Sequence, residues 1–384
     1  MRWPSLAVAA LALILAACSK DKDIDPPAEL TKFSSTLNVH RAWSANVGGK
    51  KGQAMRLGLG LAVQGGRVYA AGRGGDVVAF DVGSGKSLWR THVKGGSLSG
   101  GPGAGEELVA LGGSDGAVLA LNANDGAIRW RVAVGGEVLS APAITPRVVV
   151  VRTVDGKLHG LAPADGHEIW VYEQQVPRLS LRGTSRPVIV GDMTICGFDD
   201  GKVAAVNLAD GSLAWEATVA PSHGRTELER LVDIDSAVQV LGNDVYVVGF
   251  QGRVAMLALD SGQVWWGRDA SSYRGLALDD DAVYFSNAAG EVVALRRRTG
   301  AELWRQNVLA NRGLSAPVLM GNSIAVADFQ GYVHWLDKAS GALAARMPSG
   351  GKRVSNPPVA AGDDSLLVIN DAGQITAFRA APAK

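Results

Sequence analysis

The side chains considered for catalysis or metal binding are six histidines, two cysteines and the glutamates Glu227 and Glu229, which lie two positions apart. A zinc site needs histidines and cysteines at short spacings, and acid–base catalysis needs two ionisable groups within reach of one substrate. The histidines fall neither in an HExxH motif nor beside a cysteine: they are His40, His92, His159, His167, His223 and His334. Glu227 and Glu229 are flanked by Arg225 and Arg230, which favours a solvated charged loop over paired catalytic acids. We therefore expect no catalytic centre, no metal site and no cofactor.

Composition excludes two broad classes of protein. The 384 residues include 49 Gly and 10 Trp, are 47% hydrophobic, and carry 38 basic against 37 acidic side chains. Such a chain is too hydrophobic to be disordered, and it lacks the excess positive charge of a nucleic-acid-binding protein. High glycine content with many tryptophans favours numerous short strands joined by turns. We expect one periodic domain rather than two or three separate ones.

Residues 1–17 predict an export signal. Arg2 precedes an uninterrupted apolar run of twelve residues, Leu6–Ala17. A membrane span needs roughly 20 residues, so this run is too short to cross a bilayer but fits the core of a signal peptide. The run ends in Leu-Ala-Ala directly before Cys18, which resembles the signal of bacterial lipoproteins. That resemblance implies cleavage before Cys18 and lipidation of its thiol. In such lipoproteins an Asp directly after the cysteine commonly causes retention in the inner membrane. This chain has Ser19 there, which implies an outer-membrane anchor.

Residues 18–36 predict a flexible polar tether between the lipidated cysteine and the folded domain. The segment contains the charged stretch 20–25 and the pair Pro26-Pro27. If Cys18 carries lipid, Cys196 has no cysteine left with which to form a disulfide. Cys196 lies in an apolar run, so we expect a buried and unreactive thiol.

The remaining domain, residues 37–380, consists of one unit repeated eight times. The first glycine of each unit recurs every 38 to 51 residues: Gly75, Gly116, Gly156, Gly201, Gly252, Gly290, Gly331 and Gly373. Fourteen residues after six of these glycines stands a tryptophan: Trp89, Trp130, Trp170, Trp215, Trp266 and Trp304. In the seventh unit, Ala345 takes the place of the tryptophan. A period in this range indicates a repeat architecture.

Each unit predicts four antiparallel strands, because β-branched runs such as Val245–Val248 alternate with hairpin turns such as Asp115-Gly116. Four strands per unit of this length is typical of a propeller blade, so the fold class is all-β, an eight-bladed β-propeller. The last unit stops at Phe378, before a fourth strand. We expect the N-terminal strand around Trp43 to pair into the last blade and close the ring. The tryptophan column is interpreted as packing between blades rather than as an aromatic ligand site.

The repeat offers one enzymatic alternative. Its pattern, Asp-Gly-x-x-x-Ala-Leu followed by Gly-x-x-x-Trp, resembles that of the pyrroloquinoline-quinone (PQQ) dehydrogenases, which are also eight-bladed. That resemblance would imply a periplasmic quinoprotein enzyme with a disulfide between adjacent cysteines over the cofactor and a carboxylate-rich calcium site. Cys196 alone cannot form such a disulfide, and the chain is shorter than those enzymes. We therefore keep this function as the alternative.

Two adjacent units are longer than the others, and their extra residues fall in Glu173–Arg186 and Ala217–Asp235. Insertions in repeat proteins mark loops on one face, often the binding face. Because successive blades are neighbours in space, we expect the two inserts to emerge beside one another on one rim. Apolar residues ringed by charge suit a protein-binding surface. The alternative is that both loops fold back on themselves around a small local core.

The inserts carry two specific motifs, Leu-Ser-Leu-Arg-Gly at 179–183 and Arg-Leu-x-Asp-x-Asp at 230–235. Together with the lipoprotein signal and the eight units, they resemble the BamB family, the propeller lipoproteins of the outer-membrane β-barrel assembly machinery. The likeness covers essentially the whole chain. It implies that the inserts contact the periplasmic POTRA domains of BamA through Leu179, Leu181 and Arg182 in the first loop and Asp233 and Asp235 in the second. Arg178 and Arg186 lie in the same loop, and we regard them as neighbours of this site and not as contact residues.

The resemblance implies a scaffold without chemistry. The lipid on Cys18 would hold the propeller on the periplasmic face of the outer membrane, and the inserts would dock on BamA. With the other lipoproteins of the machinery, the protein would assist the folding and insertion of β-barrel proteins. Unfolded β-barrel substrates are therefore expected partners, and nucleic acids are not.

Overall fold

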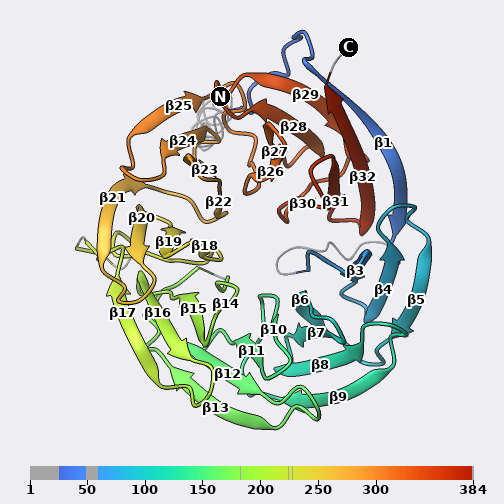
Figure 1. The fold of residues 1–384 in the computed structure, drawn as a ribbon, viewed down its shortest axis with the longest axis vertical. Helices are drawn as coiled ribbons and strands as arrows, with labels where there is room; N and C mark the ends of the chain where they lie inside the picture. The colour runs from blue at the N-terminus through green and yellow to red at the C-terminus, as the bar shows by residue number, and fades with distance from the viewer. Residues whose placement is uncertain (1–25, 49–58, 182, 224, 227, 383–384) are drawn as a thin grey trace, which may run out of the picture.

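A computed structural model describes residues 26–48, 59–181, 183–223, 225–226 and 228–382. They form 32 strands, arranged in eight four-stranded sheets that stand like wedges around a ring (Figure 1). Within these residues there is no helix, and so none long and apolar enough to cross a membrane. The predicted eight-bladed β-propeller with four antiparallel strands per blade is confirmed.

In each blade the first strand lies nearest the centre of the ring and the fourth lies at its rim (Figure 1). Blade 1 holds β2 (Leu61–Gln64), β3 (Arg67–Ala71), β4 (Asp76–Asp81) and β5 (Ser87–His92), and blade 2 holds β6 (Leu98–Ala104), β7 (Leu108–Gly113), β8 (Ala117–Asn122) and β9 (Ile128–Ala133). Blade 3 holds β10 (Ala143–Ile144), β11 (Val149–Arg152), β12 (Lys157–Leu161) and β13 (Glu168–Glu173), and blade 4 holds β14 (Val188–Val190), β15 (Met193–Gly197), β16 (Lys202–Asn207) and β17 (Leu213–Thr218).

The second half of the ring repeats this order. Blade 5 holds β18 (Gln239–Leu241), β19 (Asp244–Val248), β20 (Gly252–Ala258) and β21 (Val264–Ala270), and blade 6 holds β22 (Leu276–Leu278), β23 (Ala282–Ser286), β24 (Val292–Arg296) and β25 (Glu302–Gln306). Blade 7 holds β26 (Val318–Met320), β27 (Ser323–Ala327), β28 (Tyr332–Asp337) and β29 (Leu343–Pro348), and blade 8 holds β30 (Val359–Ala360), β31 (Ser365–Ile369), β32 (Gln374–Pro382) and β1 (Leu37–Asn46). The middle strands are buried almost throughout, because neighbouring blades cover both of their faces.

The two ends of the chain close the ring. β1 pairs antiparallel with β32, from Leu37 opposite Pro382 to Asn46 opposite Gln374. The N-terminal strand therefore supplies the outer strand that the last unit lacks after Phe378, as predicted. This pairing covers the edge of β32 that would otherwise be free at the seam.

A tryptophan of the outer strand joins seven of the eight blades to the next one. In seven blades the indole N–H donates to a backbone carbonyl of the following blade, with 2.8–3.0 Å between nitrogen and oxygen. The donor and acceptor residues are Trp43 and Val82, Trp89 and Ala123, Trp130 and Pro163, Trp170 and Leu208, Trp215 and Leu259, Trp266 and Arg297, and Trp304 and Lys338. Each ring thus buries apolar area while its one polar group finds a partner. The tryptophan column packs blade against blade.

Blade 7 is the exception, because Ala345 stands at the tryptophan position. The N-terminal chain covers this place: Thr36 N–H donates to Ala344 O at 3.0 Å, and Leu37 packs into the same hydrophobic cluster as Ala345. Residues 26–36, the described part of the predicted tether, lie along this blade and make hydrogen bonds to it.

The two cysteines occupy different parts of the chain. The predicted signal peptide, residues 1–17, and the predicted lipidation site, Cys18, lie outside the described residues. Cys196 is a free thiol with no exposed surface. Burial raises the pKa of its thiol to about 11, which keeps the reactive thiolate scarce near neutral pH.

The glycines that face the tryptophans offer a test of this packing. Gly211 has φ +73°, and a Cβ there would lie 2.9 Å from side-chain atoms of Trp170, whereas Gly191 has φ +58° and open space around it. We expect Gly191→Ala to lower the free energy of unfolding by about 1 kcal/mol through backbone strain alone. Gly211→Ala should cost about 1–3 kcal/mol more, because the tryptophan must move. Urea denaturation of both variants measures the difference. Equal losses of unfolding free energy would contradict close packing of Trp170 against Gly211.

Candidate protein-docking site

The two inserts lie side by side on one face of the ring. Because every blade has four antiparallel strands, each connection from an outer strand to the next inner strand leaves by the same face. Insert 1, residues 174–187, joins β13 to β14, and insert 2, residues 219–238, joins β17 to β18. Leu181 N–H donates to Asp233 Oδ2 at 3.1 Å, so the inserts touch directly. We call this side of the ring the insert face.

Insert 1 presents much of its predicted site to solvent. Leu179 is 43% exposed, Arg178 is exposed and Leu181 is half-buried. Arg186 is also exposed, and it lines a hollow together with residues of blades 1, 2 and 8. Arg182 lies outside the described residues. Of the two leucines predicted to bind a partner, Leu179 therefore exposes more apolar surface than Leu181.

The end of insert 2 folds into the propeller. Leu231 and Ile234 are buried, and Ile234 packs so closely over Gly197 that a Cβ on that glycine would lie 2.4 Å from it. Phe250 N–H donates to Asp233 O at 2.8 Å, which fixes this end of the insert to blade 5. The alternative expected from the sequence, a loop folded back around a local core, describes this part of insert 2.

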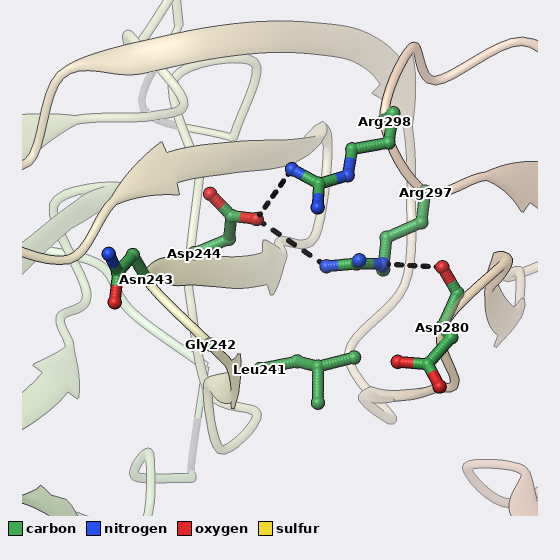
Figure 2. A pocket seen from close by; sticks show the side chains of 7 residues that line it. All are labelled: Leu241, Gly242, Asn243, Asp244, Asp280, Arg297 and Arg298. Carbon is green, nitrogen blue, oxygen red and sulfur yellow. Dashed lines mark hydrogen bonds and ion pairs between the residues drawn. The ribbon is translucent and has the colours of Figure 1, made fainter.

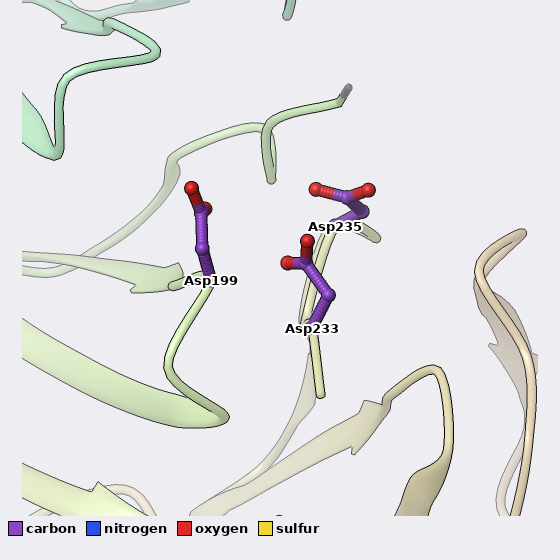
Figure 3. Close-up of side chains that lie close together, drawn as sticks. All are labelled: Asp199, Asp233 and Asp235. Atoms are coloured by element: carbon purple, nitrogen blue, oxygen red, sulfur yellow. The ribbon is translucent and has the colours of Figure 1, made fainter. Parts of the chain in front are cut away.

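The two predicted aspartates of insert 2 point inward, toward a third carboxylate. Asp233 is fully buried, Asp235 is half-buried, and Asp199 from the turn between β15 and β16 faces both of them (Figure 3). Carboxylate oxygens of the three lie within 4.8 Å of one another. Asp199, which stands directly before the turn Asp200-Gly201, is not among the site residues expected from the sequence. An additional acid beside that turn, in the blade flanked by both inserts, is the signal that could have found it.

A buried ion pair holds Asp199 in this position. Arg152 Nη2 lies 3.2 Å from Asp199 Oδ1, and the two side chains are 1% and 5% exposed. The same guanidinium lies over the ring of Phe198, 4.5 Å from its centroid. Arg152 ends β11 in blade 3, so the ion pair joins blade 3 to blade 4. Because removal of either partner would leave an uncompensated buried charge, the pair fixes the geometry of the cluster.

The cluster contains more carboxylates than Arg152 can neutralise. Burial raises the pKa of Asp233, and the charges of Asp235 and Asp199 raise it further. Burial also raises the pKa of Asp235, with the charge of Asp199 adding to the effect. Oδ1 of Asp233 and Oδ1 of Asp235 lack a hydrogen-bond partner within the described part of the chain. A proton held within the cluster relieves the repulsion.

These three aspartates are also where the described residues could place several ligand atoms around one metal ion. Carboxylate oxygens suit a hard cation such as Ca²⁺. The guanidinium of Arg152 already supplies a positive charge at Asp199, which opposes the entry of a second cation. We therefore infer that the cluster positions insert 1. Asp233 accepts a hydrogen bond from the backbone N–H of Leu181, and Asp199 and Asp235 lie beside its carboxylate.

A separate charged group lies on the opposite face, between blades 5 and 6. Asp244 Oδ2 is 3.4 Å from Arg297 Nη1 and 3.6 Å from Arg298 Nη1 (Figure 2). Arg297 Nε also donates to Asp280 O at 2.9 Å. These residues line an open hollow. Because Asp244 is paired with the two arginines, we interpret the group as a structural contact between blades 5 and 6.

The fold and the inserts define a β-propeller of PQQ-like repeats in which two adjacent connections on one face are extended. The family model described as outer membrane protein assembly factor BamB matches residues 39–99, 73–306 and 288–384. The BamB protein of Pseudomonas aeruginosa is 41% identical over 381 residues, which is 98% of this chain and 99% of that protein. The BamB protein of Bordetella pertussis is 34% identical over 379 residues, with 96% and 97% of the two chains covered. The chain belongs to the BamB family.

Solved structures agree with this assignment. The crystal structure of BamB from Moraxella catarrhalis matches with a TM-score of 0.81 at 28% identity, and covers 89% of this chain and 100% of that one. Quinohemoprotein alcohol dehydrogenase from Comamonas testosteroni matches with a TM-score of 0.71 over 89% of this chain and 76% of that one, at 12% identity. At that identity the likeness to the dehydrogenase is one of fold alone.

The buried carboxylates predict a dependence of stability on pH. Because the pKa of Asp235 is raised in the folded state, the native protein holds a proton that the unfolded chain releases above about pH 4. Stability should therefore fall as pH rises toward the raised pKa, by up to about 1.4 kcal/mol per pH unit for one extra proton. Asp235→Asn should reduce this slope to the part that the raised pKa of buried Asp233 supplies, and Asn at the exposed Asp192 should leave it unchanged. Urea unfolding at pH 5.5, 6.5 and 7.5 measures the slopes, and an unchanged slope in Asp235→Asn would refute the assignment.

Proposed function

We propose that this protein is a lipid-anchored, non-enzymatic subunit of the outer-membrane protein assembly complex, and that its insert face docks on the POTRA domains of BamA. The observation that carries the proposal is the contact of Leu181 N–H with Asp233 Oδ2, which joins the two motif-bearing inserts into one surface. Membership of the BamB family supports a role in the assembly of outer-membrane proteins.

The chemistry of the insert face suits a protein partner. Leu179 on insert 1 and Leu228 on insert 2 are 43% and 66% exposed, and exposed arginines such as Arg178 and Arg225 lie near them in the chain. An apolar centre with a polar rim is the usual composition of a protein–protein interface. Asp233 acts indirectly, because it is fully buried and bonds the backbone that carries the two leucines of insert 1.

Anchoring and substrate handling complete the proposal. The lipid on Cys18 holds the ring on the periplasmic face of the outer membrane, beside BamA and the other lipoproteins of the complex. Unfolded β-barrel proteins are the chains that the complex receives. The outer strands of the blades have one edge that pairs with no other strand in the described part of the chain. An extended substrate could add a strand along such an edge.

The quinoprotein alternative has the shared fold in its favour, as the match to the quinohemoprotein enzyme illustrates. The two cysteines of the chain are 178 positions apart in sequence, at 18 and 196, so they are not the adjacent pair that the resemblance requires. The scaffold function is therefore the better supported of the two.

Insert 1 supplies the direct test of docking. We expect Leu179→Lys and Arg182→Glu each to weaken binding to BamA, and loss of a central apolar contact of about 2 kcal/mol corresponds to roughly a 30-fold rise in Kd. Leu303→Lys is the matched control, because Leu303 is 42% exposed on the outer strand of blade 6. Co-purification with BamA and titration against its POTRA domains give the readouts. If both variants bind fully, insert 1 does not belong to the site.

The anchor has its own test. Mass spectrometry of the mature protein should find its N-terminus at Cys18, with a diacylglycerol thioether and an N-acyl chain. With an ordinary cleavable export signal in place of residues 1–17, Cys18→Ala should leave the mature protein in the soluble periplasmic fraction, because the acyl chains supply the membrane affinity. An unmodified Cys18 in the mature protein would disprove the lipid anchor.

A further inference from the structure

Residues 26–36, which we call the strap, are held at one end by the loop between β25 and β26. Ala28 N–H donates to Ala310 O at 2.9 Å, and Arg312 Nη1 donates to Ala28 O at 2.8 Å. Both polar groups of Ala28 are therefore paired with this loop. Since the loop connects an outer strand to the next inner strand, this end of the strap lies on the insert face.

The other end of the strap follows the rim of blade 7, where the blue chain before β1 passes β29 in Figure 1. Arg346 Nη1 donates to Thr31 O at 3.0 Å, and the same guanidinium lies 5.1 Å from the ring centroid of Phe33. Thr36 N–H donates to Ala344 O. The residues that hold the strap thus stand on either side of Ala345, the position at which this blade lacks a tryptophan.

A buried network fixes the two arginines of this site in place. Arg312 is 2% exposed and its Nε donates to Asp328 Oδ2 at 2.7 Å, while His334 Nε2 lies 3.0 Å from the same oxygen. Arg346 Nε donates to His334 Nδ1. Because Nδ1 accepts, Nε2 carries the proton and the imidazole is neutral, and burial lowers the pKa of His334 in the same direction. The donors to the strap are therefore positioned by the core of blade 7 itself.

We propose that blade 7 is a binding site for the chain's own N-terminal segment, and that the chain before Pro26 consequently leaves the ring on the insert face beside blades 6 and 7. The consequence at the membrane rests on the proposed lipidation of Cys18, whereas the binding of the strap does not. A strap in place leaves the eight residues 18–25 as linker, with a reach of at most about 29 Å. A free strap would add eleven residues and extend that reach to at most about 68 Å.

The strap therefore sets the distance and the orientation of the ring relative to its anchor. With a linker of eight residues, the edge of the insert face at blades 6 and 7 stays near the membrane. The inserts that form the proposed docking site lie on that same face, so the strap orients them toward proteins that sit in or just below the membrane. Release of the strap would let the ring turn and move away.

Hydrogen exchange tests the binding step in the full mature chain carrying Cys18→Ser, so that lipidation plays no part. We expect the amides of Ala28 and Thr36 to exchange at least about tenfold more slowly than in a free peptide of residues 26–36. Arg346→Gln should remove the protection of residues 31–36. Arg131→Gln, a half-exposed arginine paired with Asp115 on blade 2, should leave that protection unchanged. Exchange of residues 28–36 at the free-peptide rate in the unaltered strap would overturn the proposal.

Energy transfer to vesicles tests the orientation step. Cys18 of the mature chain is coupled to a maleimide lipid in the vesicle, which supplies the anchor by chemistry, and Cys196 does not compete because it is fully buried. A fluorescent non-natural amino acid is placed at Val308, in the loop that holds the strap, or at Asp125, in a turn on the opposite face. Transfer to a headgroup-labelled lipid should be greater from Val308, and Arg346→Gln should reduce the difference. Equal transfer from both positions in the unaltered chain would overturn the orientation.

Discussion

The indole N–H bond from the outer strand of one blade to a carbonyl of the next is the contact on which this ring depends. Each blade is a four-stranded sheet whose middle strands need cover on both faces, and neighbouring blades provide it. The tryptophan sets the spacing, because its ring fills the gap and its N–H fixes the register against one carbonyl. At blade 7, where alanine replaces the tryptophan, the N-terminal chain covers the gap and continues into the strand that closes the ring. The strap therefore lies on the blade that lacks the tryptophan, and the strand that closes the ring begins directly after it.

A ring fixed in this way turns its loops into a defined surface. Two buried carboxylates, one half-buried carboxylate and Arg152 hold the ends of the long inserts in place. A backbone amide of insert 1 donates to Asp233 of insert 2. Such a cluster is costly to bury, which is why its carboxyl pKa values are raised. The cluster lies where insert 1 meets insert 2. There the hydrogen bond from Leu181 N–H to Asp233 favours one arrangement of the two motifs. An aspartate without solvent exposure can therefore contribute to the proposed docking site by holding the backbone of insert 1.

Much of the fold could be predicted from the sequence, because its determinants recur at fixed positions. The turn glycines and tryptophans predicted eight blades, and the incomplete last unit predicted closure by the N-terminal strand. The two long units predicted adjacent inserts. Asp199 could not be found in this way, because its role depends on a turn in blade 4 meeting insert 2 more than thirty residues later. The docked strap was missed for the same reason: a polar segment with two prolines is typical of a linker, and its partners Arg312 and Arg346 stand some 300 positions away.

The proposed function requires that the insert face, and not the opposite one, meets BamA. A photo-crosslinking amino acid at Leu179 or at Asp125, in otherwise unaltered protein expressed with the complete assembly complex, distinguishes the two faces. Docking through the insert face predicts crosslinks to the POTRA domains from Leu179 and none from Asp125. Crosslinks from Asp125 without any from Leu179 would contradict it.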